Sequence, residues 1–252
     1  MILRFRILLL LALLLPGAAA LADDFDSWLS KGNAFDELGK SDRAIICYRE
    51  AEKLQPENPE LLCRIAKQYL DSLADDGSRD IKRGLAQSAL AYAERAVALD
   101  PKNSMAETLV AIAYARLSRF ADARTKVAHS QQIETHARKA IALKPDNDLA
   151  LYVLGVWNLE LANLSAFQRR IVKWMYGGIP AASNEDAERY LKQAISLNTA
   201  RPAYFVELGR VYSAMGKTDE ARAMLQKALK MPNPGKSDPL MKERAEKALR
   251  KL

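Results

Sequence analysis

One short motif recurs along the chain and constrains the fold more than any other feature. Segments of the form Ala-x-x-Leu-x-Pro, or close variants, occur as AEKLQP (51–56), AVALDP (96–101), AIALKP (140–145), AISLNT (194–199) and ALKMPN (228–233). In the first three, proline follows the last apolar position by two residues, where it cannot continue a helix. Self-similarity of this kind is typical of helical repeat arrays.

The first and last repeats match the 34-residue tetratricopeptide unit, which is a pair of antiparallel helices. The first contains Trp28, Gly32, Phe35, Gly39, Ala44, Tyr48, Ala51, Leu54 and Pro56, and the last contains Phe205, Leu208, Gly209, Tyr212, Gly216, Ala221, Leu225 and Ala228. The small residues allow two helices to approach closely. Because no pair can bury its apolar face alone, neighbouring pairs must stack. The pattern predicts an all-α tetratricopeptide-repeat solenoid of about five helix pairs.

The middle repeats keep the pattern but are longer. Successive helix-ending alanines, at 51, 96, 140, 194 and 228, lie 45, 44, 54 and 34 residues apart. In the second unit the extra length surrounds a turn signal, DDGSRD, which predicts longer helices on both sides of it. In the third, the extra residues follow Arg119 and remain compatible with helix. We expect one domain over 23–252, with units at about 25–58, 59–103, 104–147, 148–201 and 202–235 and an end helix at 238–252.

The N-terminus has the pattern of a secretory signal peptide. Arg4 and Arg6 precede an apolar run at 7–15, and small residues follow it up to Ala22. The pattern predicts a signal at 1–22, cleavage before Asp23 and a periplasmic protein. The apolar run is shorter than the about 20 residues that a spanning helix needs. An uncleaved N-terminal membrane anchor is the alternative.

Few residues indicate chemistry. Cys47 and Cys63 are the only cysteines, and we expect two small buried residues, with a disulfide as the alternative in an oxidising compartment. His129 and His136 are the only histidines, too few for the three or four protein ligands of zinc. Gly-Lys-Ser at 235–237 lacks the context of a phosphate-binding loop. We therefore expect no catalytic residue, metal or cofactor, and an enzyme is a remote alternative.

The charge of the chain does not indicate nucleic acid. The formal net charge is +7, and removal of Arg4 and Arg6 with the signal would leave +5. This mild excess is spread along the chain, whereas nucleic-acid binding usually needs a clustered basic stripe. An anionic membrane surface is compatible with it.

The first helix of each unit should line a concave face. The lining changes from polar in the first units to apolar in the third and fourth, which indicates a ligand or partner site. An amphipathic partner helix or lipid acyl chains would fit it, although such stripes are also typical of ordinary core. Only Asn33 matches the pattern by which some tetratricopeptide domains clamp a terminal carboxylate. The candidate groove residues are Met105, Ile112, Leu149, Tyr152, Val156, Leu159, Val206 and Arg210.

A segment of twenty residues, 164–183, interrupts the fourth unit and fits no helical repeat. In it Arg169, Arg170 and Lys173 alternate with apolar residues that include Trp174 and Tyr176. This predicts a short basic amphipathic helix, followed by a tight turn at 177–180. The cations are candidates for lipid head-group phosphate, with the two aromatic residues at the boundary with the acyl chains. A solvated outer face is the alternative.

The same insert carries a family resemblance. The run at 154–197, with 137–147 before it and 207–229 after it, resembles the tetratricopeptide domain of the regulator of microtubule dynamics family. The resemblance covers roughly 28–252. Its most specific parts are Gly155 with Trp157, Leu164-Ser165 with Phe167, and Pro180-Ala181 with Ala187.

The resemblance implies a tetratricopeptide fold and an apolar groove for lipid or peptide. Animal members are membrane-anchored or mitochondria-associated, are linked to microtubules and organelle contact sites, and such a domain has been associated with phospholipid binding. With its export signal, the chain looks like a bacterial, periplasmic relative.

We therefore expect a non-catalytic, exported scaffold whose groove binds a segment of a partner protein. Phospholipid binding or shuttling in the same groove is the alternative, with the insert as a lid. A scaffold predicts a groove open to water, whereas a lipid carrier predicts an enclosed apolar cavity with its mouth near the insert.

Overall fold

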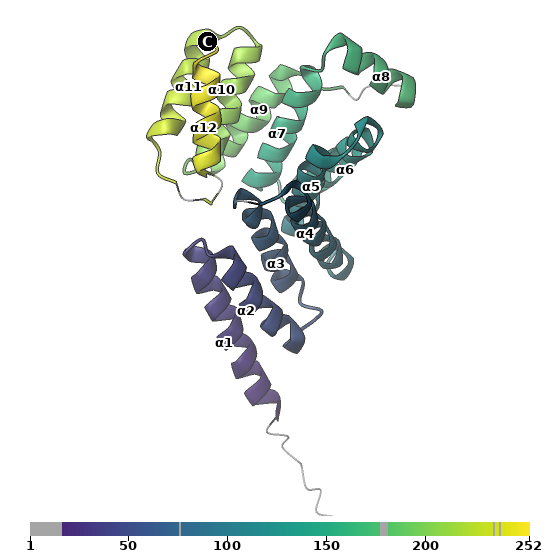
Figure 1. Cartoon of the computed structure of the whole chain (residues 1–252), viewed down its shortest axis with the longest axis vertical. Helices are drawn as coiled ribbons and strands as arrows, with labels where there is room; N and C mark the ends of the chain where they lie inside the picture. Colours follow the sequence, from purple (N-terminus) through teal and green to yellow (C-terminus); the bar gives the residue numbers. More distant parts are fainter. Residues whose placement is uncertain (1–16, 76, 177–180, 234, 237) are drawn as a thin grey trace, which may run out of the picture.

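A computed structural model describes residues 17–75, 77–176, 181–233, 235–236 and 238–252. Over these residues the chain is helical and contains no strand (Figure 1). The elements are α1 (Gly17–Glu37), α2 (Ser41–Leu54), α3 (Pro59–Asp71), η1 (Ser72–Ala74), α4 (Arg79–Leu99), α5 (Ser104–Leu117), η2 (Ser118–Phe120), α6 (Ala123–Leu143), α7 (Asp148–Ala162), α8 (Ala166–Tyr176), α9 (Asn184–Leu197), α10 (Pro202–Ala214), α11 (Thr218–Lys230) and α12 (Asp238–Leu249).

These helices form a tetratricopeptide-repeat solenoid. The pairs α1–α2, α3–α4, α5–α6, α7–α9 and α10–α11 pack closely within themselves and stack on one another, and α12 packs on the last pair (Figure 1). This confirms the predicted all-α class, with about five helix pairs and an end helix.

The recurring alanines end the helices as the sequence predicted. The carbonyl oxygens of Ala51, Ala96, Ala140 and Ala194 each accept the N–H of the residue that follows the helix. All four alanines are fully buried. The motif therefore recurs because each unit needs a small residue where its second helix meets the helix before it.

Glycines bring paired helices into close approach. A Cβ added at Gly32 would lie 2.4 Å from the ring of Tyr48, and one at Gly209 would lie 2.8 Å from Cγ of Leu225. The fourth unit repeats this contact at Gly155, whose added Cβ would lie 2.8 Å from Cγ of Leu191. The space that a larger residue would need is therefore already filled by the second helix of the pair.

The extra length of the second and third repeats lies in one helix of each pair, so the expectation of longer helices on both sides of the turn at 75–80 is wrong. The first helix, α3, has 13 residues, whereas α4 has 21. Ser78 caps α4 early, because its hydroxyl accepts the N–H of Ile81. In the third unit α6 also has 21 residues and is capped by Asp122. The first helices stay short because they pack between neighbouring units.

A buried polar network joins the third and fourth units. Asn147 caps α7 by accepting the N–H of Ala150, and its amide nitrogen lies 2.7 Å from Oγ of Ser104 and 3.0 Å from Oγ1 of Thr108. Ser104 in turn donates to the carbonyl of Ala140 at the end of α6. Buried polar groups are stable when they are paired in this way, so the network fixes how α7 stacks on α5 and α6.

One contact joins parts of the stack that are far apart in the sequence. Nζ of Lys236, between α11 and α12, lies 2.7 Å from Oδ2 of Asp75 and 3.3 Å from Oγ of Ser41. Asp75 follows η1 in the second unit, and Ser41 begins α2 in the first. The connection before the end helix therefore touches the first two units.

The predicted signal peptide stays a prediction. Residues 1–16 lie outside the described residues, and α1 runs from Gly17 through the predicted cleavage position before Asp23. Among the described residues, no single helix is long and apolar enough to cross a membrane. Taken together, α7 and α8 have the length and apolar composition of a membrane span, but the chain bends by 98° between Asp148–Ala162 and Ala166–Trp174.

Candidate functional site

The predicted groove residues divide into core and accessible positions. Val206 on α10 is fully buried beneath α12, where it packs with Met241, so its side chain is not available to a ligand. Repeat position alone does not predict this burial, because α12, which lies outside the repeat pattern, covers the last unit. Met105 is 45% exposed. The residues with intermediate burial are Ile112, Leu149, Tyr152, Val156 and Arg210.

A pocket of about 480 Å³ is formed by α7, α10 and α12. Two predicted groove residues, Leu159 and Arg210, line it. The others are Glu160, Asn163, Ser213, Ala214, Arg244, Lys247, Ala248 and Lys251. The sequence predicts α12 as a solvating end helix, and its basic residues were not among the predicted groove residues. The signal was the spacing of Arg244, Lys247 and Lys251, which places them on one helical face.

A buried carboxylate holds two arginines of this pocket in place. Glu207 on α10 is fully buried, and its oxygens lie 2.5 Å from Nη1 of Arg210 and 3.2 Å from Nη1 of Arg244. Arg210 also pairs with Glu160 at 2.8 Å. Burial lowers the pKa of Arg210, but the two carboxylates more than offset this and hold the pKa above its usual value. The guanidinium groups are therefore fixed and charged.

A further arginine lies near the positively charged residues of this pocket. Arg116 on α5 is half-buried, and within the described part of the chain it forms no hydrogen bond or ion pair. Burial lowers the pKa of Arg116 below its usual value, and the positive charges of Arg119 and Arg244 act in the same direction. Tyr152 and Asp71 act against them. The neighbourhood of the pocket thus holds a cation that no carboxylate of the described residues pairs with.

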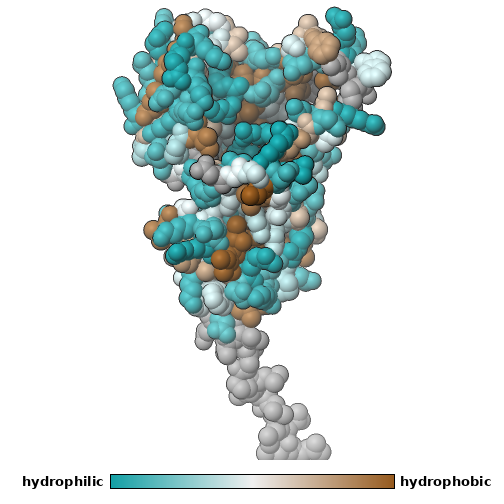
Figure 2. Space-filling view, in the orientation of Figure 1, coloured by the Kyte–Doolittle hydropathy of each residue, from teal (hydrophilic) through white to brown (hydrophobic). Residues whose placement is uncertain are grey.

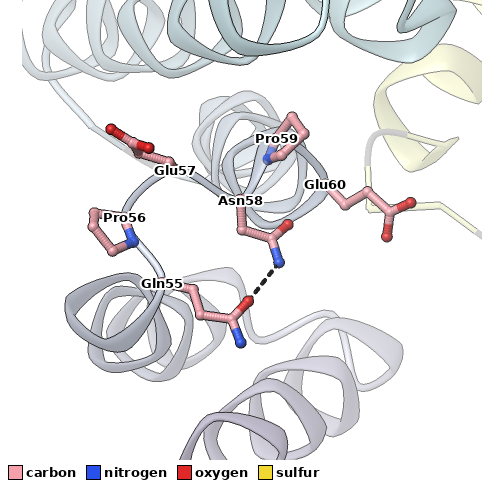
Figure 3. Close-up of a pocket in the computed structure, with 6 residues that line it drawn as sticks. All are labelled: Gln55, Pro56, Glu57, Asn58, Pro59 and Glu60. Atoms are coloured by element: carbon pink, nitrogen blue, oxygen red, sulfur yellow. Dashed lines mark hydrogen bonds between the residues drawn. The ribbon is translucent and has the colours of Figure 1, made fainter. Parts of the chain in front are cut away.

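A second pocket, of about 550 Å³, is formed by the turn between α2 and α3. Both ends of the Asn58 amide are already used, because its nitrogen donates to Oε1 of Gln55 and its oxygen accepts the N–H of Leu61 at the start of α3 (Figure 3). Figure 3 shows the carboxylates of Glu57 and Glu60 pointing away from each other. We assign this pocket to the local geometry of the turn and not to a ligand.

The insert forms the predicted short helix, α8, but this helix is not a lid over the pocket. No described α8 residue lines the pocket, and Figure 1 shows α8 extending away from α10 and α12. Arg169 donates to the carbonyl oxygens of Leu164 and Ala162, so it closes the end of α7. Arg170, Lys173 and Trp174 are exposed. The side chain of Tyr176 and the predicted turn at 177–180 lie outside the described residues.

The histidines and cysteines take structural positions. Nδ1 of His136 lies 2.5 Å from the fully buried Glu107, and His129 packs against the ring of Tyr114. Cys47 and Cys63 are buried and unbonded, and burial raises the pKa of Cys63 to about 12. Where the structure describes side chains, no group of three or more His, Cys, Asp or Glu residues is placed to hold a metal ion.

The comparisons with known proteins decide the family. The model of the family described as regulator of microtubule dynamics protein 1-3 matches residues 28–252. The chain belongs to this family. Regulator of microtubule dynamics protein 1 of Mus musculus is 27% identical over 212 residues, covering 81% of this chain and 67% of the mouse protein. The Bos taurus protein is 26% identical over 241 residues, covering 92% of this chain and 74% of the bovine protein.

A solved structure supports the fold of this regulator of microtubule dynamics family member. A thermophilic tetratricopeptide-repeat protein from Thermus thermophilus aligns with a TM-score of 0.65 and 25% identity, covering 90% of this chain and 99% of that chain. The fold and the regulator-named relatives favour a non-enzymatic scaffold with a general protein-binding role. Because part of each relative lies outside the match, the activities of the whole relatives are not carried over.

Proposed function

We propose that the protein is a non-catalytic scaffold that binds an acidic segment of a partner protein in the pocket between α7, α10 and α12. The observation that carries this proposal is the charge of the pocket lining. The lining contains four cations, Arg210, Arg244, Lys247 and Lys251, and one carboxylate, Glu160. Beside the lining, Glu207 pairs with the two arginines and Glu243 pairs with Lys247, so the cations outnumber these carboxylates by one. Cations concentrated in a concave surface attract and orient anionic partners.

The arginines of the pocket are arranged for charge-assisted hydrogen bonds. Glu207 engages one nitrogen of Arg210 and one of Arg244, whereas each guanidinium carries five N–H donors. The second terminal nitrogen of Arg210 pairs with Glu160, whereas Arg244 keeps Nη2 and Nε for a carboxylate of the partner, and its anchoring by Glu207 reduces the entropy lost on binding. Arg116, which lies outside the lining, adds positive charge near Arg244 and forms no ion pair with the described residues.

The pocket also offers apolar contacts. Leu159, Ala214 and Ala248 belong to its lining, and its volume falls within the range of about 300–1,000 Å³ typical of ligand sites. A partner helix with apolar residues on one side and acidic residues beside them would contact both the apolar lining and the cations. This is the helix-in-groove mode of recognition.

A charge-reversal pair tests the proposal. We expect Lys247→Glu with Lys251→Glu to weaken binding of an amphipathic Leu/Glu helical peptide by at least about tenfold, because both lysines become repulsive. Binding should be followed by fluorescence anisotropy at two salt concentrations. A second peptide with Gln in place of every Glu should bind the unmodified protein weakly at both salt concentrations.

The matched control changes the net charge by the same amount elsewhere. Arg222 and Lys230 lie exposed on α11 and outside the pocket. Arg222→Glu with Lys230→Glu should leave the affinity within about twofold, since exposed charges at a distance are screened by salt. Equal losses in the two double variants, or equal binding of the Glu and Gln peptides, would refute the proposal.

Phospholipid binding in the groove is the second candidate and rests on the family resemblance. The pocket that we describe is charged and open to solvent, which favours a protein segment over a lipid with two acyl chains. We also propose export to the periplasm, based on the pattern at 1–22.

Native mass spectrometry of the protein purified from a bacterial periplasm tests both of these points. We expect a mass that corresponds to Asp23–Leu252 without an adduct. A mass that retains residues 1–22 would support the uncleaved anchor instead. A discrete adduct of phospholipid mass would support the lipid candidate.

A further inference from the structure

The insert helix α8 exposes large aromatic side chains. Trp174 is 85% exposed and Phe167 is 70% exposed, more than any other large hydrophobic residue in the described chain. Residues seven apart lie on nearly the same side of a helix, so the two rings form one apolar stripe. Phe167 and Trp174 belong to none of the hydrophobic clusters formed by the described side chains. The stripe therefore has no partner among the described residues.

The charge around this stripe has a single sign. Arg169, Arg170 and Lys173 lie in α8, and the helix sequence contains no acidic residue. Figure 2 shows hydrophobic residues beside hydrophilic ones at the upper right, where α8 lies in Figure 1. Basic residues next to exposed Trp and Phe are the composition of helices that lie in the plane of an anionic membrane surface.

The orientation of α8 is fixed by its connection to α7. The two helices meet at a bend of 98°, and Arg169 donates across the corner to the carbonyls of Leu164 and Ala162. Figure 1 shows α8 projecting from the stack at the end of α7. Because α8 projects from the stack, it can contact a flat surface while every helix pair of the solenoid stays packed.

We propose that α8 docks the scaffold on an anionic lipid bilayer, with Phe167 and Trp174 at the boundary with the acyl chains and Arg170 and Lys173 on the phosphates. Charge complementarity selects this occupant. Two α8 helices of separate copies would bring six cations together without a carboxylate, which disfavours self-association. The proposal concerns the outer surface and does not depend on what the pocket between α7, α10 and α12 binds.

Vesicle co-sedimentation of the full chain tests this inference. Vesicles of phosphatidylcholine with an equal amount of phosphatidylglycerol are compared with vesicles of phosphatidylcholine alone. We expect at least about tenfold tighter binding to the anionic vesicles, with a loss of at least about tenfold in Phe167→Ala with Trp174→Ala. Arg170→Gln with Lys173→Gln should remove most of the preference for anionic vesicles, because each cation near such a surface contributes to binding.

Two matched controls account for the loss of apolar area and of charge. Leu38 and Ile46 are 65% and 62% exposed and lie in the first unit, and Leu38→Ala with Ile46→Ala should bind like the unmodified protein. Arg222→Gln with Lys230→Gln should keep the anionic preference. Binding of the unmodified protein to vesicles of phosphatidylcholine alone measures the part that residues 1–22 contribute through their apolar run, and each variant is compared after this part is subtracted. Unchanged binding of Phe167→Ala with Trp174→Ala would overturn the proposal, and so would an oligomer that this variant loses in the absence of lipid.

Discussion

Replacing Trp157 with alanine should lower the free energy of unfolding by about 3–5 kcal/mol, the range for deletion of a large buried aromatic side chain. Trp157 on α7 is 4% exposed and packs with Leu154 and Ile133. Its indole N–H lies 3.0 Å from the carbonyl oxygen of Ser130 and 3.0 Å from its hydroxyl. The substitution would open a cavity between α6 and α7 and leave polar atoms of Ser130 without this donor.

Urea unfolding followed by far-UV circular dichroism measures this effect without relying on tryptophan emission. The control is Trp174→Ala, which removes the same side chain from a position that is 85% exposed. We expect this control to change stability by no more than about 0.5 kcal/mol, as for most surface substitutions. Similar losses in the two variants would show that Trp157 does not have the buried role described.

Gly209→Leu should destabilise the protein by about 3 kcal/mol through overpacking. A Cβ at this position would lie 2.8 Å from Cγ of Leu225 and 3.3 Å from the carbonyl oxygen of Ala221. Leu225 and Ala221 are fully buried, so neither atom has space into which it can move. The helices α10 and α11 would have to separate, and the packing of α12 on both would be lost with them.

A glycine in open space gives the matched comparison. Gly84 lies within α4, and an added Cβ would meet nothing within 4 Å. Gly84→Leu should raise stability by about 0.5–1 kcal/mol, since leucine has the higher helix propensity. The two substitutions should therefore shift the urea midpoint in opposite directions. A higher urea midpoint for both variants would mean that helix propensity, and not close helix approach, governs Gly209.

The regular parts of the fold were predictable because local pattern and packing agree. The alanines at 51, 96, 140 and 194 belong to the motif that predicts each helix end. In the structure they are buried in the last turn of their helices. The distribution of extra length within a unit was not predictable from the turn signal alone. It depends on Ser78 and Asp122, whose caps start α4 and α6 early.

The candidate site was less predictable because it depends on how distant helices meet. Leu159 and Arg210 were assigned to the groove from repeat position, and both line the pocket. Val206 was assigned by the same rule but is covered by α12, a helix outside the repeat pattern. Glu207 has no sequence signal of its own, and its pairing with Arg244 exists only because α12 folds back on α10.

The contact of Lys236 with Asp75 and Ser41 gives this repeat array a property that a linear stack lacks. In a linear stack each unit touches only its neighbours, and the two ends are mechanically independent. Here residues 161 positions apart, Lys236 and Asp75, meet in an ion pair that is partly exposed, an interaction worth about 0–1 kcal/mol. The two ends of the array are therefore linked by one weak contact, which can break while every helix pair stays packed.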